Sequence, residues 1–160
     1  MTSYSLEALV GRTEVMAGLP AVLVGAGHVP LGDDLVLVPV PLELLRHLYD
    51  DEPVLDAVRD VVGPLVVGAS DRGAVAYLHA ELFDEEGSEG AVVWDHGRVV
   101  FECFEDPATG AGPLDRGLAV LGVDGGPDGD AFDRLGLGRH RTLGAWITDA
   151  GLRVTDAGRA

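Results

Sequence analysis

The chain has one cysteine, no lysine, few aromatic residues and no long apolar run. The lone Cys103 excludes an internal disulfide framework and a cysteine-rich zinc site. No apolar run approaches the roughly 20 residues that a membrane-spanning helix needs, and the first residues lack the basic region and apolar core of a signal peptide. These absences predict a cytoplasmic protein with no membrane partner.

The lack of lysine is part of a strong charge imbalance. The 27 acidic residues outnumber the 11 basic ones, all of them arginine, and give a formal net charge of −16. Such a field repels nucleic acid and attracts basic proteins, so we expect a basic protein partner and no nucleic acid. The alternative is that the acidity only keeps the protein soluble.

The apolar pattern predicts a single α+β domain over residues 1–147, with a flexible tail or a late edge strand over 148–160. We expect an antiparallel sheet of about five or six strands, with short helices packed on one face. The expected helices cover 5–10, 13–16, 41–48, 53–62, 113–121, 130–135 and 142–147, and the expected strands cover 28–31, 35–40, 65–69, 74–83, 91–94 and 98–104.

The clearest strand pattern lies in residues 74–83, where the side chains alternate. The even positions are small and apolar, which is typical of a strand packed under a helix. The odd positions form a mixed row that we expect on an outer face: Val75, Tyr77, His79, Glu81 and Phe83.

A hairpin follows, with its turn at His96 and Gly97. If Asp95 faces Arg98, uninterrupted pairing places Trp94 opposite Val99 and Val92 opposite Phe101. Residues opposite one another share a face, so this register predicts one core row: Val92, Trp94, Val99, Phe101 and Cys103.

Motifs for catalysis or cofactor binding are weak. The glycines of residues 22–27 lack the third glycine of a dinucleotide fingerprint, and Pro30 would break the helix that such a site needs. His79 and Glu81 lie on one strand face and could hold a metal ion with Glu102, although a third ligand is not assured. The alternative is a satisfied histidine on a half-exposed sheet, and we expect no cofactor.

The outer row is the better candidate for a protein interface. Tyr77 and Phe83 are suited to anchor a partner, and the acidic loop 84–90 beside them is suited to steer it. The steering carboxylates in that loop are Asp84, Glu85, Glu86 and Glu89. The alternative is that another segment covers the row. The basic cluster Arg139, His140 and Arg141 could grip an anion or bridge to the chain's own acids.

Two segments carry a family resemblance. Tyr77 to Phe83 reads Tyr-x-x-Ala-Glu-hydrophobic-Phe, and residues 136–141 read Gly-Leu-Gly-Arg-His-Arg ahead of Trp146. This latter half of the chain resembles small, uncharacterised bacterial proteins of actinomycete type. Proteins of this size, acidity and α+β form are similar to immunity proteins that neutralise secreted toxins. The resemblance implies a non-catalytic inhibitor that presents an acidic surface to a basic toxin domain.

Two other functions stay open. A metal-assisted hydrolase would use His79 and Glu81, and a structural homodimer would join two copies through the outer row.

Overall fold

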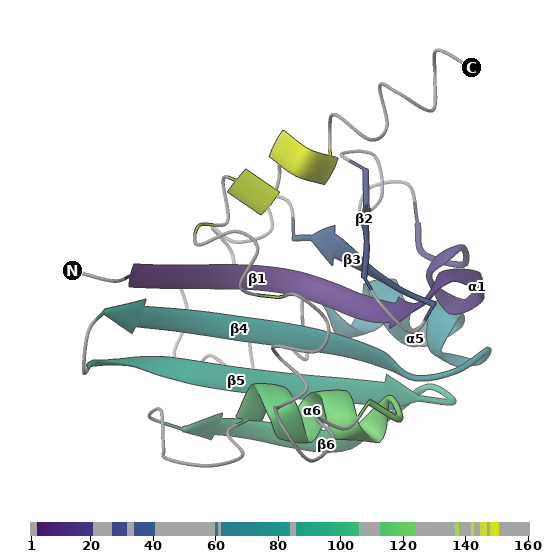
Figure 1. Cartoon of the computed structure of the whole chain (residues 1–160). Helices are drawn as coiled ribbons and strands as arrows, with labels where there is room; N and C mark the ends of the chain where they lie inside the picture. Colours follow the sequence, from purple (N-terminus) through teal and green to yellow (C-terminus); the bar gives the residue numbers. More distant parts are fainter. Residues whose placement is uncertain are drawn as a thin grey trace.

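A computed structural model describes residues 3–20, 27–31, 34–40, 60, 62–83, 86–105, 113–123, 137, 142, 145–146 and 148–150. Six antiparallel strands form one sheet in the order β2-β3-β1-β4-β5-β6 (Figure 1). The predicted α+β class with its antiparallel sheet is confirmed. Among the described elements β2 and β6 form the two edges.

The first element is a strand, β1 (Ser3–Arg12), where we expected a helix. It pairs with β3 on one side and with β4 on the other, so it lies in the middle of the sheet. Leu6, Leu9 and Val10 fit a helical face, but they are buried because both faces of this strand are covered. Because the spacing of these three residues also fits one face of a helix, it predicts the wrong element although polar and apolar residues alternate along the strand.

The next elements match the expectation. Helix α1 (Thr13–Met16) follows β1 directly, and β2 (Val29–Pro30) pairs with β3 (Leu35–Pro39) as an antiparallel hairpin. Asp34 adopts a positive φ of 61°, a conformation that aspartate tolerates better than most residues.

Helix α5 (Gly63–Ser70) replaces the strand that we expected over residues 65–69. Pro64 lies in the first turn of this helix, where its missing N–H costs nothing. A five-residue apolar run has no periodicity that could separate a short strand from a buried helix.

The central ribbon consists of β4 (Val75–Phe83), β5 (Glu86–Asp95) and β6 (Arg98–Glu105). The predicted turn is confirmed, with Asp95 opposite Arg98 and Trp94 opposite Val99. Beyond that point the register differs, because β6 carries one extra residue, Val100, and the next pair is Val93 with Phe101. This bulge shifts the rest of β6 by one position, which exchanges its faces.

The bulge splits the predicted core row. Val92 and Trp94 belong to one core cluster, whereas Phe101 packs against the other. Cys103 lies opposite Ala91, and Val99 is 38% exposed.

Helices cover both faces of the sheet and not one face as expected. Helix α6 (Pro113–Val120) packs on the even row of β4, whereas α5 packs on the odd row (Figure 1). The outer face is therefore a second interior. Its core includes Val75, Tyr77, Val92, Trp94 and Val66.

Several expectations fall outside the described residues: the helices predicted over 41–48 and 53–62, apart from residues 60 and 62, and the cluster Arg139, His140 and Arg141. At the far end, residues 148–150 are helical and Ala150 belongs to a core cluster. No helix among the described residues has the length and apolarity to cross a membrane.

Candidate functional site

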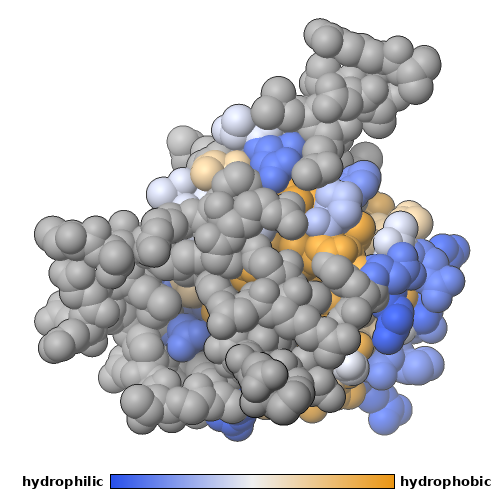
Figure 2. Space-filling view, in the orientation of Figure 1, coloured by the Kyte–Doolittle hydropathy of each residue, from blue (hydrophilic) through white to orange (hydrophobic). Residues whose placement is uncertain are grey.

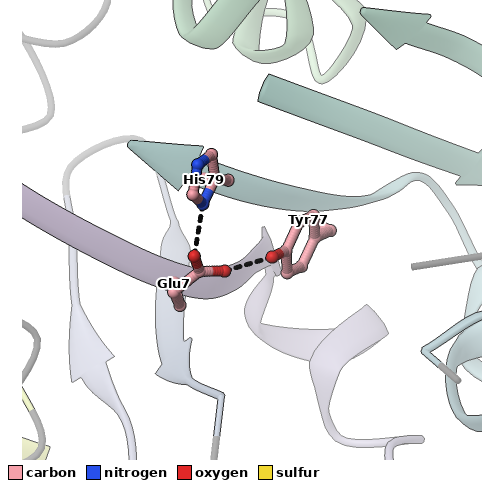
Figure 3. Close-up of polar contacts among 3 residues, drawn as sticks. All are labelled: Glu7, Tyr77 and His79. Atoms are coloured by element: carbon pink, nitrogen blue, oxygen red, sulfur yellow. Dashed lines mark hydrogen bonds and ion pairs between the residues drawn. The ribbon is translucent and has the colours of Figure 1, made fainter. Parts of the chain in front are cut away.

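Three polar side chains meet in the interior of the second face. Glu7 of β1 lies directly opposite His79 of β4, and Tyr77 lies two residues away on the same face of β4. The exposed fractions are 4% for Glu7, 5% for His79 and 1% for Tyr77. We call these three residues the buried polar cluster (Figure 3).

The Glu7 carboxylate is the centre of the buried polar cluster. Its Oε2 accepts a hydrogen bond from the Tyr77 hydroxyl, and its Oε1 contacts Nδ1 of His79 (Figure 3). A buried carboxylate is costly unless hydrogen-bond donors surround it, and the two partners meet that need from one strand. The cluster therefore ties β1 to β4 through side chains as well as backbone.

An aromatic ring from a third strand closes the cluster. The ring of Phe104 on β6 stacks on the His79 imidazole, with centroids 5.6 Å apart and planes 19° apart. Gly90 of β5 lies between them in the register. A Cβ at position 90 would come within 2.4 Å of the Phe104 ring, so the stacking requires glycine there.

This geometry resembles part of a catalytic triad. A carboxylate on Nδ1 fixes the tautomer and orientation of a histidine that acts as a general base. A base must also reach a substrate, and these side chains are all 5% exposed or less. The buried polar cluster therefore acts in this conformation as a cross-link within the sheet.

The structure places Glu7, and not the predicted Glu81, in contact with His79. Glu7 takes the place beside His79 that we assigned to Glu81, which is half-buried two residue pairs further along, opposite Ser5. Glu102 is exposed on β6 opposite Val92. Among the described residues, no three histidine, cysteine, aspartate or glutamate side chains can share a metal ion.

The predicted partner-binding residues that the structure describes do not form one exposed surface. Tyr77 is interior, so it has no surface to offer a partner, and the alternative that another segment covers the row is correct for it. Only the backbone of Phe83 is described, and Asp84 and Glu85 fall outside the described residues. Glu86 and Glu89 are part of β5, so most of the expected loop 84–90 is strand.

Sequence reasoning missed Glu7 because it placed residues 5–10 in a helix. A signal was present: Ser5, Glu7 and Leu9 form a mixed row and the residues between them an apolar row, as in β4. No protein-family model, curated protein or solved structure matches the chain. The resemblance to actinomycete-type proteins stays a prediction.

Proposed function

We propose that the chain is a non-catalytic module that binds a basic protein partner in the cytoplasm and does not bind nucleic acid. The observation that carries the proposal is a group of exposed apolar side chains around the β5–β6 turn. Among the described residues, the large hydrophobic side chains that are exposed are four valines: Val67 at 39%, Val99 at 38%, Val100 at 52% and Val120 at 41%. We call them the valine surface.

The four valines approach the turn from three elements. Val99 and Val100 follow it on the edge strand β6, and Val100 is the bulged residue. Val67 of α5 lies 3.6 Å from the position that a Cβ at Gly97 would occupy. Val120 of α6 lines a cavity together with Asp95, the residue before the turn. Because α5 and α6 pack on opposite faces of the sheet, Val67 and Val120 flank the turn from its two sides, and Val99 and Val100 lie on the edge strand between them. Exposed apolar residues around one ordered turn are the basis of the proposed interaction surface.

The turn that carries this surface is held in place. Ser70, which is fully buried at the end of α5, accepts a hydrogen bond from the Gly97 N–H on its hydroxyl oxygen. Its backbone oxygen accepts another from the His96 N–H, at 2.8 Å. A surface fixed before binding loses little conformational entropy when a partner docks.

The net charge of the chain favours a basic partner. Close to the turn the charges are mixed, with Asp71 and Asp95 beside the exposed Arg72 and Arg98. The preference therefore rests on the net charge of −16, which acts at longer range. Complementary charge raises the association rate, and desolvated apolar contacts supply affinity. An immunity-like inhibitor that occludes a basic toxin domain is the specific form that we propose.

The test begins with the neighbouring gene, which we expect to encode a secreted protein with a basic C-terminal domain, and uses that domain as the partner. We expect the double variant Val99→Ser with Val100→Ser to bind it at least about tenfold more weakly, because two exposed valines lose apolar contact. The measurement is isothermal titration calorimetry, with stopped-flow association at two salt concentrations. The matched control is His28→Gln, which changes an exposed residue beside β2 at the opposite edge of the sheet.

Two results would overturn the proposal. One is equal affinity for the double variant and the control. The other is a chain dimer that persists at nanomolar concentration and loses its stability when the valines are replaced, since the surface would then join two copies.

A further inference from the structure

A cavity at the same end of the sheet indicates a site for a small molecule. A cavity of about 370 Å³ opens where β1 ends, β4 begins and α6 ends. Figure 2 shows hydrophilic residues gathered over this end of the molecule. Four charged side chains line the cavity: Arg12, Glu14, Arg72 and Asp95.

The two arginines are available to a ligand. Both are exposed, and within the described part of the chain neither guanidinium makes a hydrogen bond or an ion pair. Nη2 of Arg12 lies 3.7 Å from the position of a Cβ on Gly122, whose φ of 90° also favours glycine. Two unpaired cations in one cavity of an acidic protein are a site for a carboxylate.

The acids make the site selective. Asp95 Oδ1 is buried, and Nδ1 of the exposed His96 forms an ion pair with it at 2.7 Å. Glu14 adds a second negative charge to the lining. A simple anion would be repelled by these two carboxylates, and a simple cation by the two guanidiniums. A molecule that carries one positive and one negative charge can pair with both the carboxylates and the guanidiniums.

The rest of the lining is apolar. Val15 and Leu121 present buried side chains to the cavity, and Val120 stands beside them. We propose that the cavity binds a free α-amino acid with an apolar side chain: its carboxylate on Arg12 and Arg72, its ammonium group toward Asp95 and Glu14. This site does not depend on the proposed protein partner.

The test titrates the full chain with L-leucine in a calorimeter. We expect binding that falls at least about tenfold for N-acetyl-L-leucine, which lacks the ammonium charge, and for L-leucinamide, which lacks the carboxylate. Arg12→Gln and Arg72→Gln should each lose a similar factor. Arg98→Gln is the matched control, because Arg98 is exposed at the same end of the sheet but is not part of the cavity lining.

Thermal unfolding of each variant in the absence of ligand separates lost binding from lost folding. The proposal is wrong if the two blocked compounds bind as well as L-leucine, or if Arg98→Gln weakens binding as much as the cavity variants. It is also wrong if 10 mM L-leucine, an excess of about tenfold over a millimolar dissociation constant, gives neither heat nor a shift in the unfolding temperature.

Discussion

Glu7 is a carboxylate inside a sheet, and its two neighbours explain how it is tolerated there. Each carboxylate oxygen has its own partner, Tyr77 on one side and His79 on the other. Removing one partner from a buried charged group costs more than the net value of the bond, because the remaining group stays buried without it. The buried polar cluster should therefore respond strongly to small changes.

Tyr77→Phe tests this at the level of one oxygen atom. The variant keeps the ring, which is 1% exposed, and removes the hydroxyl that donates to Glu7. We expect the free energy of unfolding to fall by about 1.5–3 kcal/mol, the usual cost of a lost hydrogen bond to a charged group. Urea unfolding followed by tryptophan fluorescence measures it.

The control is the same substitution in a Glu7→Gln background. There the carboxylate is absent, so the loss of the hydroxyl should cost clearly less. An equal cost in both backgrounds would show that the effect of Tyr77→Phe comes from packing and not from Glu7.

Among the elements, β4 and the following turn were predictable from the sequence, whereas β1 and α5 were not. β4 and the turn at His96 and Gly97 follow from alternation and turn chemistry. β1 was missed because the spacing of Leu6, Leu9 and Val10 also fits one face of a helix, and α5 was missed because a short apolar run has no period that distinguishes strand from helix. Tertiary packing determines the secondary structure of both segments.

The bulge at Val100 marks another limit of the sequence. The sequence of β6 carries no signal for a bulged residue at Val100. The bulge nevertheless moves Phe101 and Cys103 from the predicted face of the strand to the opposite face. The buried polar cluster was predicted only in part, for a similar reason. His79 was identified from β4 alone, but its partner Glu7 is 72 residues away and depends on the pairing of β1 with β4.

The contact between α6 and the sheet gives a prediction at this scale. Gly117 lies close to the sheet, since a Cβ there would be 2.8 Å from Cβ of Ala91 on β5. That atom is fixed to a strand backbone and cannot rotate away. We expect Gly117→Ala to destabilise the fold by on the order of 1 kcal/mol, because overpacking exceeds the gain in helix propensity.

Gly68 of α5 is the matched control, since a Cβ there would have nothing within 4 Å. Gly68→Ala should stabilise the chain by about 0.5–1 kcal/mol through helix propensity alone. Thermal and urea unfolding of both variants would contradict the packing argument if the two substitutions shifted stability in the same direction.

In the part of the chain that the structure describes, helices pack on both faces of the sheet. α6 covers one face of the central strands and α5 the other, and β4 is buried over residues 75–80. The valine surface and the arginine-lined cavity both lie around the β5–β6 turn. Both proposed binding sites therefore lie at the end of the sheet that carries this turn.

Net charge gives the last prediction. The formal charge of −16 on 160 residues makes the folded chain repel itself, more than the expanded unfolded chain does. Raising NaCl from about 10 mM to about 1 M shortens the Debye length from about 30 Å to about 3 Å. We expect the unfolding temperature and the urea midpoint to rise across this range. KCl should act as NaCl does, because screening depends on ionic strength, and a stability that stays constant or falls in both salts would show that self-repulsion is not a major cost of this fold.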